Sequence, residues 1–141
     1  MKKSKRPKTS KTRAPAAKLA ALPDDALLEV VQRQTFRYFW DAAHPVSGLA
    51  YDRRSSARGA KNPVDDPVAI GGSGFGVMAL IVAVARGWVT RAAAVERLER
   101  MLNLLLRARC YHGAFPHFMN GRTGDTVTFG RKDDAADLVE T

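Results

Sequence analysis

Apolar residues recur every three or four positions in several segments of the chain, and this periodicity predicts α-helices. The first helix is expected to begin at residues 24–25, where either aspartate can cap it, and to stop at the His-Pro pair of residues 44–45. The second runs through residues 77–84 and ends at Gly87. Because its residues are apolar on nearly all sides, we expect a buried inner helix.

A third helix is predicted from Thr90, whose hydroxyl can act as the N-cap. Its apolar residues form one stripe, and most of its charged residues lie outside that stripe. The stripe consists of Val95, Leu98, Leu102, Leu105 and Leu106. We therefore expect this helix to lie on the surface and to cover the second helix.

The last nine residues, 133–141, place three carboxylates at helical spacing. In an α-helix at about 100° per residue, Asp133, Asp137 and Glu140 fall within an arc of roughly 60°. Crowded like charges in a partly dry site resist ionisation, so we expect a raised pKa for at least one of them. Capping by Asp133 or Asp134 is the structural alternative, although it leaves the other two carboxylates unexplained.

Two long connections separate the predicted helices. Residues 45–69 are rich in Arg, Asp, Gly and Pro, and a connection of that length is typical of a functional or mobile loop. Residues 112–129 contain the turn signal Asn120-Gly121 and a short strand at 126–129, which predicts a β-hairpin. The order of inner helix, outer helix, decorated loop and inner helix predicts an all-α fold of stacked helical hairpins, either a toroid or a solenoid.

The net charge of +9 is concentrated in the first part of the chain. Residues 1–18 contain eight lysines or arginines and no acid, and the remainder balances 15 basic against 14 acidic residues. We expect residues 1–22 to be a disordered basic tail and residues 23–141 to form the domain. No specific nucleic-acid partner is predicted, because no recognition motif accompanies the tail.

Targeting signals are not apparent in the sequence. The longest apolar stretch, residues 77–85, is about half as long as a membrane span needs to be. We recognise no signal peptide and leave the cellular location unassigned.

The glycines ahead of the apolar helix do not form a nucleotide-binding motif. Gly72, Gly74 and Gly76 have G-x-G-x-G spacing, whereas a dinucleotide-binding loop needs G-x-G-x-x-G. We expect Ser73 to cap the helix and the glycines to allow close packing.

Residues 111–120 combine flat aromatic faces with polar tips. These residues are Tyr111, Phe115, His117, Phe118 and Asn120. Such a mixture suits the binding of a sugar or another polar ring. Packing of the aromatic residues in the core explains them equally well. The spacing of His112 and His117 fits no zinc site, with or without Cys110, so we predict neither a metal nor a cofactor.

The acidic segment also contains the sequence Asp133-Asp134-Ala135-Ala136-Asp137, which matches the D-D-x-x-D motif of isoprenoid synthases. In those all-α enzymes the carboxylates share Mg²⁺ that is bridged to diphosphate. No basic cluster accompanies the motif here except Arg131 and Lys132. This function is kept as the alternative.

Five ordered segments resemble the opening third of the glucoamylase-like family, which includes the endo-β-1,2-glucanases of glycoside hydrolase family 144. The segments are residues 31–40, 44–50, 70–79, 115–121 and 132–141, and the resemblance covers residues 24–141. It implies an (α/α)6 toroid that cleaves β-1,2-glucan by inversion, without a metal, in a cleft at one end of the barrel.

The resemblance implies that three carboxylates are needed for catalysis, namely Asp133, Asp137 and Glu140, with Asp134 beside them in the sugar site. From the aromatic segment we add His117, Phe115 and Asn120 as candidate substrate-binding residues. The roles of general acid and general base stay open, because further acidic residues of the family's cleft lie downstream of the motif.

The chain stops after about a third of such a toroid. We therefore expect a truncated piece that lacks the C-terminal part of the barrel and is inactive by itself. A non-catalytic remnant that binds glycan or protein partners is the alternative from a different functional class.

Overall fold

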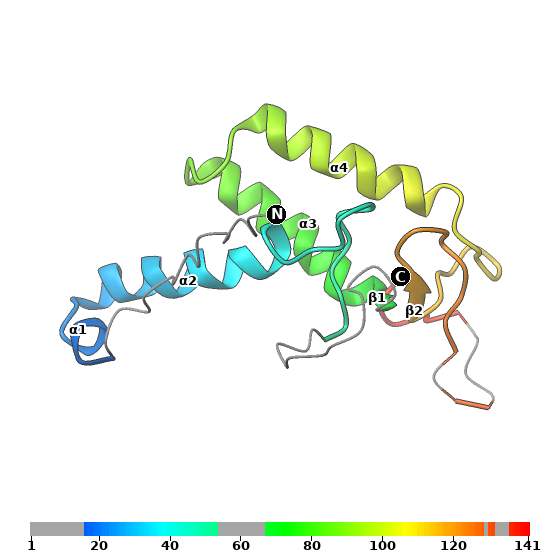
Figure 1. The fold of residues 1–141 in the computed structure, drawn as a ribbon, viewed down its shortest axis with the longest axis horizontal. Helices are drawn as coiled ribbons and strands as arrows, with labels where there is room; N and C mark the ends of the chain where they lie inside the picture. Colours follow the sequence, from blue (N-terminus) through cyan, green and yellow to red (C-terminus); the bar gives the residue numbers. More distant parts are fainter. Residues whose placement is uncertain (1–15, 54–66, 129, 132–135) are drawn as a thin grey trace, which may run out of the picture. The chain divides into compact units, whose positions relative to one another are not determined.

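A computed structural model describes residues 16–53, 67–128, 130–131 and 136–141 (Figure 1). The chain divides into two compact units, Met1–Gln32 and Arg33–Thr141. The first unit contains α1 (Ala16–Ala20) and the beginning of α2 (Asp24–Trp40). The short helix α1 falls in the segment assigned to the basic tail, and residues 1–15 of that segment lie outside the described residues, so the tail stays a prediction.

The predicted start of the first long helix is confirmed, since α2 begins at Asp24, and it ends at Trp40. Within the second unit, the buried Phe36 ring lies 5.8 Å from that of Trp40 and 5.7 Å from that of Trp88. Arg97 closes the end of α2 by donating to the backbone carbonyls of Phe39 and Trp40, with its guanidinium 4.5 Å from the Trp40 ring. The cation–π contact and the two hydrogen bonds tie α2 to the rest of the unit.

The second long helix, α3 (Ile70–Ala85), begins earlier than predicted and includes the glycine-rich segment. Ser73 is therefore not the N-cap. Its hydroxyl donates to the carbonyl of Ala69 at 2.7 Å and accepts from the N–H of Ala50 at 3.1 Å, so it joins the helix to a neighbouring segment. The prediction of close packing at the glycines is confirmed at Gly76, where an added Cβ would lie 3.3 Å from the Phe39 ring.

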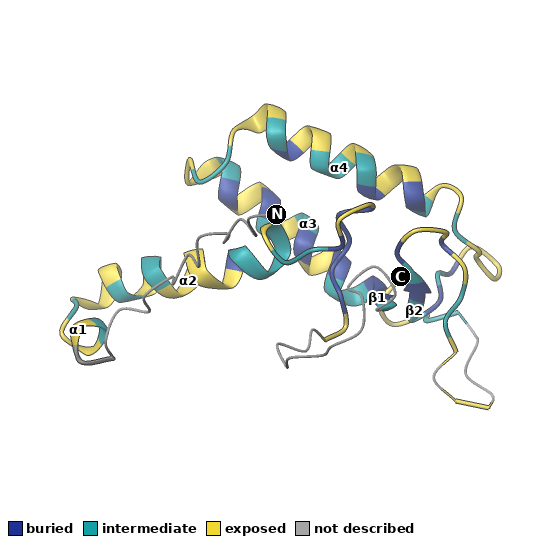
Figure 2. Cartoon of the chain, viewed as in Figure 1, coloured by how far each residue is buried: buried dark blue, intermediate teal, exposed yellow. Residues whose placement is uncertain are grey.

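One face of α3 is exposed, which differs from the predicted helix buried on all sides (Figure 2). Phe75, Met78 and Ile81 are 66%, 61% and 67% exposed, while Leu80 and Ala83 are buried. The described residues pack against one side of the helix, so its apolar surface on the other side faces solvent.

The next helix, α4 (Arg91–Leu105), begins as predicted, because the Thr90 hydroxyl accepts from the N–H of Ala93 at 3.2 Å. It forms a hairpin with α3 (Figure 1). The predicted apolar stripe is wrong in its register: Ala94, Met101 and Leu104 are buried, whereas Leu102 and Leu106 are exposed. The helix turns this face to the core because Arg97, on the same face, packs over Trp40.

A two-stranded antiparallel sheet pairs β1 (Pro67–Ala69) with β2 (Phe118–Asn120). The centre of the pairing is Val68 opposite Met119, and both side chains are fully buried. Strand β1 belongs to the connection that the sequence left without structure. The predicted hairpin is present in part, since Met119 also forms a bridge with Thr126 across the turn.

The core below the sheet joins residues from several segments. Its largest fully buried members are Leu49, Tyr51, Val68, Leu104 and Met119. None of the helices in the described part of the chain is long and apolar enough to cross a membrane.

Candidate active site

The candidate site forms where residues 115–117 run antiparallel to residues 136–137. Pro116 forms an isolated bridge with Ala136, and the N–H of Asp137 donates to the carbonyl of Phe115 at 2.7 Å. On the other side, the carbonyl of His117 accepts from the N–H of Ile70 at the start of α3. These backbone hydrogen bonds place the side chains of His117 and Asp137 next to each other.

Three side chains meet at this point and are called the His117 cluster: His117, Asp137 and Glu140. The Nδ1 atom of His117 lies 2.5 Å from Oδ2 of Asp137 and 3.4 Å from Oε2 of Glu140. Both carboxylates therefore converge on one ring nitrogen. The side chains of His117 and Asp137 are 31% and 16% exposed, so the cluster is partly accessible.

The two carboxylates are not brought together by a helix, as the sequence predicted. Ala136 lies in an extended bridge, and residues 138–140 form a turn, so a continuous helix from Asp133 to Thr141 does not form. Instead, Oδ1 of Asp137 accepts from the N–H groups of Val139 and Glu140 at 2.9 and 3.1 Å. Asp137 thus caps the turn that carries Glu140, which is the geometry of a helix N-cap.

Glu140 is held by the first turn of α3. Its Oε2 accepts from the N–H of Gly71 at 3.2 Å. A Cβ at position 71 would lie 2.5 Å from the Glu140 Cδ, so only glycine leaves room for this carboxylate. A negative charge near the start of a helix is also favoured by the helix dipole.

The pairing of His117 with Asp137 changes the pKa of both groups. The hydrogen bond that the His117 ring donates to Asp137 raises the pKa of His117 above 6.5, with the charges of Glu140, Asp137 and Asp52 adding to the rise and burial opposing it. The same hydrogen bond, with those from Val139 and Glu140, lowers the pKa of Asp137 below 3.8. The raised carboxyl pKa that the sequence predicted therefore does not occur at Asp137.

Next to the cluster lies a hollow of about 350 Å³, called here the aromatic hollow, and its lining combines aromatic and acidic side chains. The lining residues are Tyr38, Phe39, Tyr51, Asp52, Ala69, Gly72, Phe75, His117 and Glu140. The Tyr38 hydroxyl donates to the backbone carbonyl of Tyr51 at 2.6 Å, which fixes the ring in the wall. Flat rings beside carboxylates suit the apolar faces and hydroxyl groups of a sugar.

Sequence reasoning missed Asp52 and Phe75. Asp52 lies in the long connection, which the sequence marked as functional or mobile without singling out a residue. Phe75 lies among the glycines, where the sequence prediction rested only on the glycine spacing and Ser73. Since both line the aromatic hollow with Glu140, they join the candidate site.

The structure does not bring all predicted site residues to this place. Asp133 and Asp134 lie outside the described residues. The Asn120 side-chain oxygen accepts from the N–H groups of Arg122 and Thr123 at 2.8 and 3.1 Å, so it supports the turn after β2. Phe115 packs against the core and borders a second hollow of about 190 Å³, which Glu140 also borders.

The His117 cluster has the composition of a cation site. One nitrogen of His117 and one oxygen from each carboxylate lie within 4.8 Å of one another, and these atom types bind divalent metals. The sequence did not indicate this cluster, because His117 lies 20 residues before Asp137 and is not part of the D-D-x-x-D magnesium motif. The same atoms make the hydrogen bonds described above, which a bound cation would replace.

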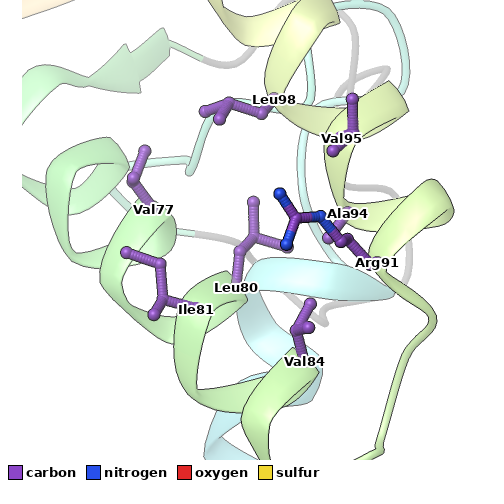
Figure 3. Close-up of a pocket in the computed structure, with 8 residues that line it drawn as sticks. All are labelled: Val77, Leu80, Ile81, Val84, Arg91, Ala94, Val95 and Leu98. Atoms are coloured by element: carbon purple, nitrogen blue, oxygen red, sulfur yellow. The ribbon is translucent and has the colours of Figure 1, made fainter.

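A separate apolar groove lies between α3 and α4 (Figure 3). Side chains from both helices point into it, and Arg91 extends its guanidinium across it toward Leu80 (Figure 3). Its other lining residues are alanine, valine, leucine and isoleucine, so it offers no reacting group.

Comparison with known proteins finds relatives that are named as carbohydrate-cleaving enzymes. The chain is 44% identical, over 121 residues, to an exo-β-1,2-glucooligosaccharide sophorohydrolase of Parabacteroides distasonis, and the match covers 85% of the chain and 16% of that protein. No family model matches the chain.

Two solved structures share the fold. An endo-β-1,2-glucanase of Chitinophaga pinensis, solved with sophorotriose and glucose, has a TM-score of 0.79 at 45% identity, covering 86% of this chain and 29% of that one. A β-1,2-glucanase of Parabacteroides distasonis has a TM-score of 0.74 at 42% identity, covering 84% of this chain and 16% of that one.

The chain is therefore a homologue of β-1,2-glucanases with the glucoamylase-like toroid fold, as the sequence resemblance predicted. It spans between 16% and 29% of the length of the relatives described here.

Proposed function

We propose that the His117 cluster and the aromatic hollow form part of the active site of a glycoside hydrolase that cleaves β-1,2-linked glucan. The observation that carries the proposal is the meeting of His117, Asp137 and Glu140 beside that hollow. Support comes from the 42–45% identity to β-1,2-glucanases over most of the chain.

In this proposal the carboxylates Asp133, Asp137 and Glu140 serve the reaction. Asp134 is a proposed contact to the substrate, and Asp52 and Phe75 are added because they line the hollow together with His117. Phe115 and Asn120 do not line that hollow and are not proposed as contacts there. Phe75 offers an exposed ring on which a sugar face can stack, and Asp52 can accept from sugar hydroxyls.

The spacing of the carboxylates bears on the mechanism. An inverting hydrolase holds its acid and base roughly 6.5–9.5 Å apart so that water can enter between them. The cluster atoms of Asp137 and Glu140 lie within 4.8 Å of each other. We propose inversion in which these two residues act on one side of the sugar, and the opposing carboxylate comes from Asp133 or from polypeptide beyond residues 1–141.

The experiment is a reducing-end assay on β-1,2-glucan and on sophorotriose. It is run on the 141-residue chain and on the complete polypeptide that contains it. Release of reducing ends by the complete polypeptide, with none from β-1,3- or β-1,4-glucan, is the expected result. Absence of cleavage by the complete polypeptide would refute the proposal.

Two alternatives have distinct outcomes. An isoprenoid synthase needs Mg²⁺ and would lose its activity in the presence of a chelator. Under the proposed hydrolase function, we expect a chelator to leave glucan cleavage unchanged. The geometry also argues against that function, because Asp137 contacts His117 and Ala136 beside it lies in a bridge and not in a helix. A non-catalytic remnant would bind sophorotriose in calorimetry without releasing products.

A further inference from the structure

We propose that His117 is a positioning residue that fixes Asp137 as an anchor and directs Glu140 toward the substrate, so that Glu140 is the carboxylate of the pair that meets the sugar. The inference rests on the proposed glycoside hydrolase function. It assigns different roles to two acidic residues that the sequence treated alike.

The first observation is that Asp137 is hydrogen-bonded within the protein through both carboxylate oxygens and through its backbone. Its Oδ2 contacts His117 at 2.5 Å, and its Oδ1 accepts from two backbone N–H groups of its own turn. Its backbone N–H donates to Phe115, and its carbonyl accepts from the Thr141 hydroxyl at 2.5 Å. A carboxylate bound in this way is held ionised and in place, which suits an anchor better than a proton donor.

The second observation is the orientation of Glu140. Among the described residues, both partners of its carboxylate, the Gly71 N–H and His117, lie at Oε2, which leaves Oε1 for a ligand. Glu140 lines the aromatic hollow together with His117. The carboxylate is therefore fixed through one oxygen and open to the hollow through the other.

The third observation is the charge around the imidazole. The groups that act on His117 are Asp137, Glu140 and Asp52, all acidic, and they favour the protonated ring. A protonated ring between two carboxylates offsets their repulsion, which allows both to stay close while the ring carries its charge. Without the protonated ring, the two carboxylates would move apart and the Glu140 carboxylate would no longer be held toward the aromatic hollow.

The test compares two replacements of His117 with matched geometry. Replacement by Asn places an amide nitrogen near the position of Nδ1 and keeps a hydrogen-bond donor there. Replacement by Phe keeps a ring but removes the donor. His112→Asn is the control, because His112 is exposed and its positive φ of 50° suits asparagine. A misplaced catalytic group lowers turnover by about 10²-fold, so we expect His117→Phe to lower kcat by that factor with KM little changed, and His117→Asn, which keeps the donor but not the positive charge, to recover part of that loss.

The kinetic arm uses the complete polypeptide and sophorotriose as substrate. Equal activity of His117→Phe and wild type would overturn the proposal. An effect of His117→Phe on KM alone would also overturn it, because it would make His117 a substrate contact and not a positioning residue.

An NMR titration of the imidazole nitrogens in the complete polypeptide tests the same contacts without any activity. We expect Asp137→Asn to lower the pKa of His117 more than Glu140→Gln does. A His117 pKa that does not respond to Asp137→Asn would overturn the positioning role. If no glucan is cleaved by wild type but the titration behaves as expected, the proposed function fails while the positioning role stands.

Discussion

Glu140 contacts Gly71, 69 residues earlier in the chain: the Glu140 Oε2 accepts from the Gly71 N–H at 3.2 Å, and there is no room for a side chain at position 71. The acidic turn and the start of α3 therefore share one contact, and the absence of a Cβ allows it. This pair links the helical hairpin to the candidate site.

Replacing Gly71 by Ala should displace the Glu140 carboxylate and reduce glucan cleavage by the complete polypeptide. The matched control is Gly74→Ala in the same helix, because nothing lies within 4 Å of a Cβ there. Alanine is favoured over glycine inside a helix by about 0.5–1 kcal/mol, so the control should be more stable by that amount with unchanged activity. Urea unfolding and the reducing-end assay measure both effects. Full activity of Gly71→Ala would show that the Glu140 position is not critical.

Replacing the acidic residues one at a time should separate catalysis from folding. General acid or base groups contribute about 10²–10⁴-fold and a misplaced catalytic group costs about 10²-fold, so we expect Asp133→Asn, Glu140→Gln and, through the loss of the anchor, Asp137→Asn each to lower kcat of the complete polypeptide by at least about 10²-fold. Glu99→Gln, on the exposed face of α4, is the control. Circular dichroism should show an intact fold in all four variants. Near-normal turnover in the three site variants would defeat the assignment.

Stability should depend on pH through the His117–Asp137 pair. The lowered pKa of Asp137 means that its contribution is present above pH 3.8 and is lost as the pH falls through the lowered value. The raised pKa of His117 means that its contribution is present below pH 6.5 and is lost as the pH rises through the raised value.

The contribution of the pair to the free energy of unfolding should therefore be largest between pH 3.8 and 6.5. Chemical denaturation of wild type and Asp137→Asn across this range measures it, and the difference should shrink at both ends. Because the pair is partly exposed, added salt should weaken it. A difference that is constant with pH would contradict the pairing.

The stereochemistry of cleavage tests the proposed division of roles. If the opposing carboxylate lies elsewhere, the first product formed from β-1,2-glucan should have the inverted α configuration. If Asp137 and Glu140 were themselves the acid and nucleophile, their short separation would favour retention, for which carboxyl groups stand roughly 5–5.5 Å apart. Proton NMR during the first minutes of hydrolysis distinguishes the anomers, and a β product would contradict the proposal.

The exposed face of α3 should make the 141-residue chain prone to association. Phe75, Met78 and Ile81 are each more than half exposed, and burying such a side chain is worth about 1.5–3 kcal/mol. We expect the chain to bind a hydrophobic dye, to associate, or to melt without a sharp transition. Met78→Gln with Ile81→Gln should reduce dye binding. A cooperative monomeric transition without dye binding would contradict this expectation.

Local features of the fold could be predicted from the sequence because they depend on neighbouring residues. Thr90 caps α4 through an N–H three residues away, and α2 starts at the aspartates that favour a helix N-terminus. The resemblance to the glucoamylase-like family also followed from ordered motifs in the chain. The closeness of Asp137 and Glu140 was predicted, although for the wrong reason, since a helix was expected where a capped turn forms.

The tertiary structure alone decided which distant residues meet. Nothing in the spacing of the chain indicates that β1 pairs with β2, that Asp137 bonds His117, or that Asp52 and Phe75 line one hollow with Glu140. The face of α4 that is buried was also decided by tertiary packing: Arg97 lies over Trp40, and Met101, one turn further along the same face, is buried. Periodicity and capping act over three or four residues, whereas these contacts join segments dozens of residues apart, and their energy depends on the folded path of the whole chain.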